Sequence, residues 1–192
     1  MTVGPIDVAL ASGSDALAGR LLELPESQWF DRKSARIEPR KLAETIVAFA
    51  NADGGTIVVG LSGGKVEGVD SDPKRLNALM QANVDFTDPT VPTQSRLYEC
   101  VRADGGSDHL LVIEVPPGRT VYATNRDEAY LRLGDESRKL SFAQRRELFY
   151  DKSQSSFESE LTKLRVNDVD RALLDSYVMA LGAGGGSAPR SP

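Results

Sequence analysis

Two carboxylates near residue 30 have a spacing that could support chemistry. Glu26 and Asp31 lie in the stretch "ESQWFDRK", residues 26–33. Two carboxylates can hold a divalent metal ion for hydrolysis of a phosphodiester, although such a site normally takes a third oxygen ligand. Lys33 falls on the same face of a strand as Asp31, because side chains alternate with a period of two. Its ammonium group could then neutralise a phosphate in the transition state.

Basic side chains follow directly after this segment, interrupted by one acid, Glu38. The first basic cluster comprises Arg32, Lys33, Arg36, Arg40 and Lys41. A second cluster comprises Arg132, Arg138, Lys139, Arg145 and Arg146. Each cluster could follow a phosphate backbone, and each could equally be an ordinary solvated surface. Aromatic rings that could stack on bases, or be buried in the core, are those of Trp29, Phe30 and Tyr130.

Composition narrows the class of protein. The chain has 192 residues, of which 40% are hydrophobic and 27% charged, which is typical of one soluble globular domain. Its apolar runs are far shorter than the roughly 18 residues of a membrane span, so we expect no membrane segment. The N-terminus does not have the pattern of a signal peptide and the chain has a single cysteine, so we expect a cytoplasmic location. The net charge of −5 argues against a uniformly basic surface but allows a local basic patch.

Single residues argue against several chemistries. His109 and Cys100 are the one histidine and the one cysteine, too few for a zinc site built from nitrogen and sulfur ligands or for an intrachain disulfide. Catalysis by a Ser–His or Cys–His pair would depend on His109, and no "GxSxG" motif is present. The glycine pairs in "NADGGTIVVG" and "GLSGGK" do not match a Walker loop, so ATP binding has no motif to support it.

Helices and strands are expected to intermingle. Helices are predicted over 14–24, from Pro39 to about residue 50, after Ser71-Asp72-Pro73, and over 141–152 with Ser141 as the cap. Strands are predicted over 29–33, 56–61, 95–103, 109–115, 120–124 and 128–134, with "SGGK" as a hairpin turn and "DFTDPTVP" as a loop. Since strict β-α-β alternation is absent, the expected fold class is α+β.

Composition also suggests boundaries along the chain. We expect a flexible leader at 1–13, a folded domain at 14–152 and a C-terminal helical extension at 153–182. Residues 183–192, "AGGGSAPRSP", are expected to be a flexible linker or a point of truncation.

Four collinear stretches resemble the Schlafen AlbA-like domain. They are "ESQWFDRKSA", "LAETIVAFANADGGTIVVGL", "VEGVD" and "AYLRLGDESRKLS", and together they span roughly residues 22–150. The resemblance implies a mixed sheet with helices packed on it, related to the archaeal protein Alba. It also implies a nucleic-acid-binding module of the DNA-binding or transcription-regulator type. An older label of divergent ATP-binding protein attaches to many members.

The resemblance also implies a possible ribonuclease centre. Some Schlafen proteins are RNases that combine two acids around the first strand with one further acid. Glu26 and Asp31 match the first two, and Lys33 matches the family lysine. Ser62 stands where the third acid is expected, and Asp31 is one methylene shorter than the usual glutamate.

Three hypotheses follow. The leading one is a DNA- or RNA-binding domain that needs no cofactor and contacts phosphates through Arg32, Lys33, Arg36, Arg40, Lys41, Arg132 and Arg138. The second is an endoribonuclease that uses Glu26 and Asp31 as ligands of Mg²⁺ or Mn²⁺, with Lys33 beside them. The third is an interaction module in which the edge of the sheet pairs with a second copy to give a homodimer.

Overall fold

A mixed four-stranded sheet organises the chain, for which a computed structural model describes residues 4–161. The order of its strands is β1-β2-β7-β6, with β1 parallel to β2 and the other neighbours antiparallel. These strands are β1 (Phe30–Lys33), β2 (Gly55–Val59), β6 (Gln94–Val101) and β7 (Ser107–Val115). The α+β class and the mixed sheet are therefore confirmed.

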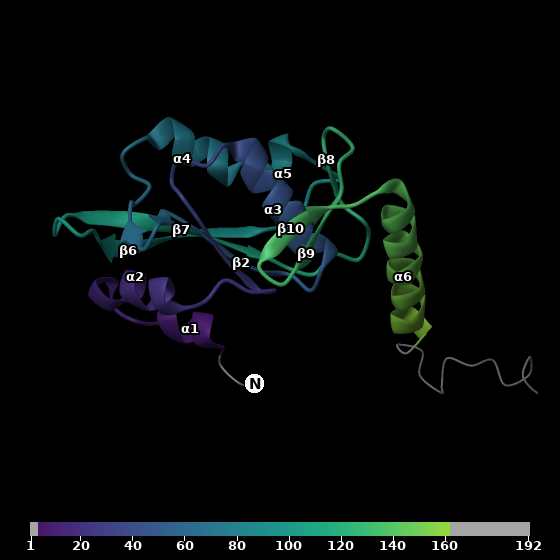
Figure 1. The fold of residues 1–192 in the computed structure, drawn as a ribbon, viewed down its shortest axis with the longest axis horizontal. Helices are drawn as coiled ribbons and strands as arrows, with labels where there is room; N and C mark the ends of the chain where they lie inside the picture. The colour runs from purple at the N-terminus through teal and green to yellow at the C-terminus, as the bar shows by residue number, and fades with distance from the viewer. Residues whose placement is uncertain (1–3, 162–192) are drawn as a thin grey trace, which may run out of the picture. The chain divides into compact units, whose positions relative to one another are not determined.

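Helices cover both faces of this sheet (Figure 1). On one face lie α1 (Pro5–Leu10) and α2 (Ser14–Glu23), and on the other lie α3 (Pro39–Asn51), α4 (Pro73–Met80) and α5 (Ala82–Asp85). Each face has its own apolar cluster. Val58 and Val112 pack on the α1/α2 side, and Ile57 and Ile113 pack on the α3 side. The continuous apolar runs of β2 and β7 thus reflect burial on both faces of the sheet.

Local sequence explains the bounds of helix α3. Pro39 opens the helix, where its fixed φ and missing N–H cost nothing. After the helix the chain turns tightly into β2 through Gly54 and Gly55. A Cβ at Gly55 would lie 2.3 Å from the ring of Phe49, so only glycine allows β2 to approach α3 this closely.

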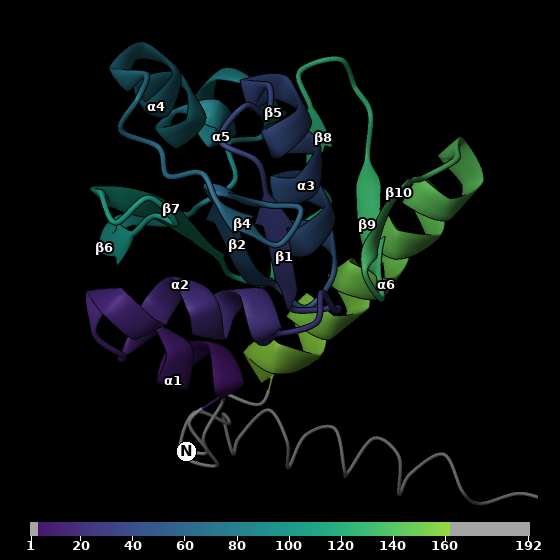
Figure 2. The same ribbon diagram turned by 60° about the vertical axis from the view of Figure 1, so that its left-hand side comes forward.

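Smaller ribbons surround the sheet. They pair β3 (Leu61–Ser62) with β4 (Lys65–Val66), β5 (Thr87–Asp88) with β8 (Ala123–Thr124), and β9 (Tyr130–Leu133) with β10 (Glu136–Lys139). Figure 2 shows β9 and β10 beside α3. The predicted hairpin at "SGGK" is confirmed, with Gly63 and Gly64 both at positive φ, as a two-residue turn of this kind requires.

Helix α6 (Phe142–Leu161) follows the β9–β10 ribbon. Ser141 caps it, because the Oγ of Ser141 accepts from the backbone N–H of Gln144 while the amide of Ser141 donates to the Gln144 side chain. Lys152 donates to the carbonyls of Ala50 and Gly118, at 3.3 and 2.6 Å. Burial lowers the pKa of Lys152. The chain divides into two compact units, residues 1–152 and 153–192, and the following sections concern the first.

Several predicted boundaries differ from the structure. The expected flexible leader contains α1, since Ala9 and Ile6 pack in the cluster under α2. The expected loop at 85–92 contains β5, and the second strand of the β9 ribbon, β10, was not predicted. The predicted strand at 120–124 shortens to β8 because it pairs only with the two residues of β5.

Two other expectations concern the ends of the chain and membranes. The predicted extension at 153–182 lies outside the described residues beyond Leu161, and the predicted linker at 183–192 lies outside them entirely. Within residues 4–161, no helix has the length and apolar character needed to cross a membrane.

Candidate nucleic-acid interface

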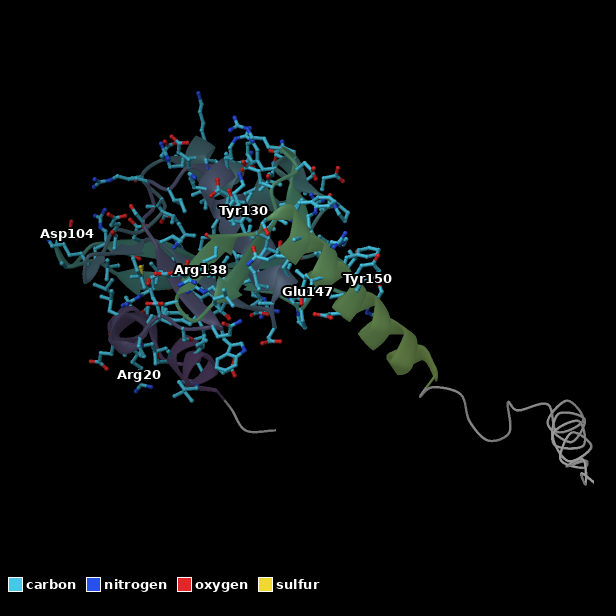
Figure 3. All side chains as sticks on the ribbon, turned by 45° about the vertical axis from the view of Figure 1, so that its right-hand side comes forward. Arg20, Asp104, Tyr130, Arg138, Glu147 and Tyr150 are labelled. Atoms are coloured by element: carbon cyan, nitrogen blue, oxygen red, sulfur yellow. The ribbon has the colours of Figure 1, made fainter. Side chains whose placement is uncertain are left out.

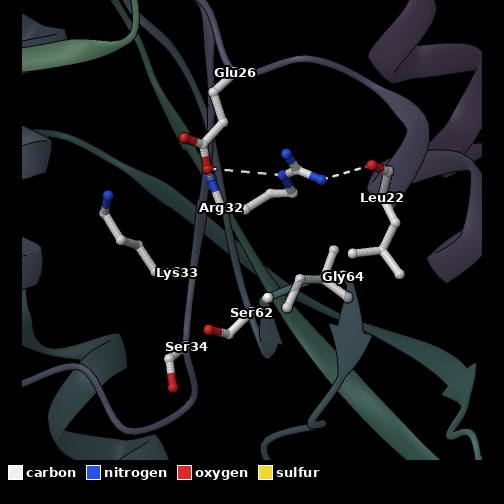
Figure 4. Close-up of a pocket in the computed structure, with 9 residues that line it drawn as sticks. Leu22, Glu26, Arg32, Lys33, Ser34, Ser62 and Gly64 are labelled. Carbon is white, nitrogen blue, oxygen red and sulfur yellow. Dashed lines mark hydrogen bonds and ion pairs between the residues drawn. The ribbon is translucent and has the colours of Figure 1, made fainter.

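A polar pocket of about 310 Å³ lies where β1 ends beside the β3–β4 turn (Figure 4). The end of β1 contributes charged and hydroxyl side chains, and the turn contributes a serine and two glycines. The lining residues are Leu22, Glu26, Arg32, Lys33, Ser34, Leu61, Ser62, Gly63 and Gly64. The pocket therefore gathers Glu26, Arg32 and Lys33, three of the residues singled out in the sequence, with Ser62.

Asp31 does not line this pocket. Its side chain is 1% exposed, and Oδ1 lies 3.2 Å from Nη2 of Arg132. The other oxygen, Oδ2, lies 2.6 Å from Nζ of Lys33, which confirms that Asp31 and Lys33 share a face of the strand. Asp31 thus holds two cations, one buried and one at the pocket.

The positive charge of Lys33 is only partly neutralised, because Asp31 pairs with Arg132 as well as with Lys33. Its side chain is 29% exposed, whereas that of Arg132 is 1% exposed. One carboxylate cannot neutralise two cations, so the group of Asp31, Lys33 and Arg132 has a net charge of +1 when all three are ionised. The partly exposed ammonium of Lys33 is where an incoming anion can meet that charge.

Glu26 and Arg32 neutralise one another across the pocket mouth. The carboxylate of Glu26 accepts from the backbone N–H of Arg32 at 3.2 Å, and its Oε1 lies 3.7 Å from Nε of Arg32. The guanidinium also donates to the carbonyl of Leu22 at 2.6 Å, as drawn in Figure 4. Arg32 is therefore held in place by two partners but keeps N–H groups that can reach the pocket.

Ser34 continues the pocket toward Arg36. The hydroxyl of Ser34 donates to Glu67 at 2.6 Å and accepts from the backbone N–H of Arg36 at 3.1 Å. The Arg36 side chain is exposed, and among the described residues no ion pair involving it is found. Arg36 is thus an exposed cation two residues along the chain from Ser34, which lines the pocket.

The other predicted phosphate contacts lie elsewhere. Arg40 donates to Asn125 at 2.9 Å and stacks over the ring of Phe86. Lys41 pairs with Glu44 at 2.9 Å, and Arg138, labelled on β10 in Figure 3, pairs with Glu136 at 3.0 Å. Of the five basic residues of the first cluster, Arg32 and Lys33 line the pocket, whereas Arg40 and Lys41 have partners of their own and are not among its lining residues.

Arg132 requires a correction. It was predicted to contact phosphates, but it is the largest fully buried side chain among the described residues. Its guanidinium donates to the carbonyls of Ser27 and Phe30, and it lies 4.9 Å from the centre of the Phe49 ring. Arg132 therefore fixes β9 to the segment that leads into β1 and cannot touch a ligand in solvent.

The remaining members of the second basic cluster are distributed over the surface. Lys139 pairs with Glu128 at 2.6 Å, which lowers the pKa of the Glu128 carboxyl. Arg145 pairs with Asp127, while Arg146 is exposed beside the aromatic rings of α6. These residues do not gather around the pocket.

The three aromatic candidates for base stacking also separate. Phe30 is buried in the core, and Tyr130 is half-buried with its hydroxyl donating to Glu128. Trp29 alone among them is exposed, at 56%, and it lines a different, largely apolar hollow beside α1.

The residues do not fit the metal site that the ribonuclease hypothesis needs. Asp31 is buried and engaged by two cations, and Glu26 is engaged by Arg32. Ser62 does line the pocket at the place of the expected third acid, but it brings a hydroxyl rather than a carboxylate. Across the part of the chain that the structure describes, no three His, Cys, Asp or Glu side chains converge as metal ligands.

Sequence reasoning missed two features of this region. Glu67 joins β4 to the chain after β1, because its carboxylate accepts from both Ser34 and the amide of Ala35. Lys65, the exposed first residue of β4, follows Gly64 of the pocket lining. The hairpin signal at "SGGK" located Lys65, but only the folded chain places the neighbouring Gly63 and Gly64 in one pocket with Lys33.

Comparison with known proteins identifies a family and includes a similar solved structure. The sequence model of the family described as Schlafen, AlbA_2 matches residues 26–141. The solved structure of the DIP2311 protein from Corynebacterium diphtheriae is similar, with 21% identity and a TM-score of 0.46 over 62% of this chain. The match covers 26% of that chain, so this sequence corresponds to about a quarter of its length. No curated protein matches the sequence.

Proposed function

Since the chain belongs to the Schlafen AlbA_2 family, we propose that it binds nucleic acid through backbone phosphates at the polar pocket beside β1. The observation that carries the proposal is the sharing of Asp31 between buried Arg132 and partly exposed Lys33. The uncompensated positive charge lies at Lys33, where a phosphate can reach it. Hydrogen bonds between charged groups are the stronger kind, so one such contact contributes measurably to affinity.

Neighbouring groups suit the same ligand. Arg32 presents remaining guanidinium N–H groups, and the hydroxyl of Ser62 faces the pocket. Arg36, two residues after Ser34, and Lys65, which follows Gly64, have no carboxylate partner among the described ion pairs. Contacts of this kind position a nucleic-acid backbone without reading its sequence. A more specific version of the proposal is a role in transcription regulation. It requires that the protein bind duplex DNA more tightly than RNA.

The first prediction compares two lysines by fluorescence anisotropy with labelled duplex DNA, single-stranded RNA and duplex RNA. Lys33→Gln should weaken binding about tenfold, because it removes one charge-assisted hydrogen bond. Lys74→Gln, which changes an exposed lysine on α4, is the matched control and should bind as the unchanged protein does.

The outcomes separate the alternatives. Equal affinities for the Lys33 and Lys74 variants would refute the pocket as the binding site, and failure of the unchanged protein to bind any of the three probes would refute the function. A preference among the probes decides between DNA and RNA. Cleavage of the RNA probes in Mg²⁺ or Mn²⁺ would show that binding alone is too narrow a description.

A further inference from the structure

Strand β6 forms one outer edge of the main sheet. It pairs with β7 on one side, and among the described residues no strand pairs with its other side. Figure 2 shows β6 outermost in the sheet, beyond β7. With eight residues, Gln94–Val101, it offers a long row of backbone donors and acceptors at this edge.

The sequence of β6 lacks the usual protection of an edge strand. Exposed edges are commonly blunted by lysine, proline, bulges or very short length. "QSRLYECV" contains neither lysine nor proline, and its register with β7 runs without a bulge over all eight residues. The edge is therefore suited to accept another strand.

The opposite edge of the sheet differs. Strand β1 has four residues, and the carbonyl of Phe30 at its start already accepts from Ser27 and from buried Arg132. That edge is short and engaged within the chain. Of the two edges of the main sheet, that of β6 is therefore the open one among the described residues, so association through it closes at two copies and does not continue into a filament.

An exposed leucine lies at the centre of β6. Leu97 is 43% exposed and lies directly across from buried Leu111 of β7, on the face that α3 covers further along the sheet. Its neighbours Arg96 and Glu99 are exposed and carry opposite charges. Leu97 shares its face with Glu99, whereas Arg96 points to the opposite face. An exposed apolar side chain on this open edge favours a partner that places apolar surface at the same position.

We propose that two copies of this chain pair through β6 in antiparallel orientation, with Leu97 of each copy beside the twofold axis. With a twofold axis perpendicular to the sheet, side chains that point to one face in the first copy point to the same face in the second. Residues directly opposite one another are therefore both even-numbered or both odd-numbered. The registers that pair five or more residues are then centred on Arg96, Leu97, Tyr98 or Glu99.

Side-chain chemistry selects among these four registers. Centring on Arg96 or Glu99 sets like charges directly opposite, which is unfavourable. Centring on Tyr98 sets Leu97 against Glu99. Centring on Leu97 pairs leucine with leucine, Ser95 with the carboxylate of Glu99, and Arg96 with the ring of Tyr98. This register covers the apolar side chain and joins the two four-stranded sheets into one of eight strands.

The test introduces a positive or a negative charge at position 97 of the full 192-residue chain. Sedimentation velocity then measures whether each variant is a monomer or a dimer. The unchanged protein should be a dimer whose population rises with concentration. Leu97→Lys and Leu97→Glu should each be monomeric, because like charges then meet at the axis, and an equimolar mixture of the two should return to a dimer. Circular dichroism checks that each variant is folded.

Leu133→Lys is the matched control, because Leu133 is 45% exposed on β9 and should leave the dimer intact. Leu97→Cys gives a second readout: mild oxidation should join two copies through position 97, whereas buried Cys100, whose pKa is raised to about 11 by burial, stays a thiol. A monomeric unchanged protein, or a Lys/Glu mixture that stays monomeric, overturns the proposal. So does dissociation caused by Leu133→Lys. Nucleic-acid binding at the β1 pocket is measured separately and does not depend on this outcome.

Discussion

His109 forms an ion pair with Asp70 on the surface of β7. The ring Nδ1 lies 2.8 Å from Oδ2 of Asp70, and this hydrogen bond to a carboxylate raises the pKa of His109. Protonation is then more favourable in the folded chain than in the unfolded chain. The resulting stability is fully present below the unfolded pKa of about 6.5 and is lost as the pH rises through the raised folded value.

This pH dependence can be measured directly, because the chain has one histidine. We expect an NMR titration to give a pKa for His109 above the usual value, and Asp70→Asn to bring it back toward that value. Both side chains are well exposed, so the effect on stability should be small. A His109 pKa that is the same with and without the Asp70 carboxylate would contradict the ion pair.

At the scale of elements, the contact between β9 and β1 depends on one buried ion pair. Arg132 on β9 reaches Asp31 on β1, and both side chains are 1% exposed. Breaking a buried ion pair typically costs about 3–5 kcal/mol, and the remaining pair of Asp31 with Lys33 places the loss toward the lower end of that range. We therefore expect Arg132→Met to lower the free energy of unfolding by about this amount in urea denaturation.

A double mutant tests whether the pair itself is responsible. Asp31→Asn with Arg132→Met should cost less than the sum of the two single changes, because neither charge is then left alone. Additive losses would mean that Arg132 acts mainly through its bonds to the carbonyls of Ser27 and Phe30. The same set of mutants tests whether the Asp31 carboxylate stabilises the fold rather than binding a metal ion.

At the scale of the whole molecule, the distribution of charge limits how many phosphates can be held. The net charge is −5, and Lys41, Arg138 and Lys139 each have a carboxylate partner. Lys33 and Arg32 line the pocket although each also has a carboxylate partner, and Arg36, two residues after the lining residue Ser34, is exposed without one among the described ion pairs. For duplex DNA, we expect log affinity to fall with log salt with a slope of roughly −2 to −3, since each phosphate contact contributes about −0.9.

The slope distinguishes the pocket from an extended basic surface. Seven contacts, as the sequence suggested, would give a slope of roughly −6. Anisotropy titrations at several salt concentrations measure it, with the Lys33→Gln variant expected to lose about one contact. A flat response would contradict binding through phosphates altogether.

Local sequence determined those elements whose energetics are local. Pro39 predicted the start of α3, the signal at Ser71-Asp72-Pro73 predicted α4, and the predicted cap at Ser141 is confirmed by its hydrogen bonds. The glycine pair at 63–64 predicted its hairpin. Each of these signals depends on residues within about one or two turns of each other, so composition and spacing suffice.

Tertiary structure determines which charged side chains are buried and which partners they have. Arg132 and Asp31 are 101 positions apart, and nothing local to either residue indicates the other. In "YLRL", residues 130–133, the period-two alternation places both leucines on one face of the strand and Tyr130 with Arg132 on the other. From this pattern alone, the face with the leucines would be expected to be the buried one. The packing of α3 against β9 reverses this, because Phe49 and the Asp31 carboxylate together accept the guanidinium.

The sequence alone therefore determined the family, the fold class and the segment that carries the pocket, through collinear local patterns. Which cations face solvent was settled only by the folded chain. A charged side chain is free or neutralised according to the groups that long-range packing places within a few ångströms of it, and that distance is not encoded in spacing along the chain.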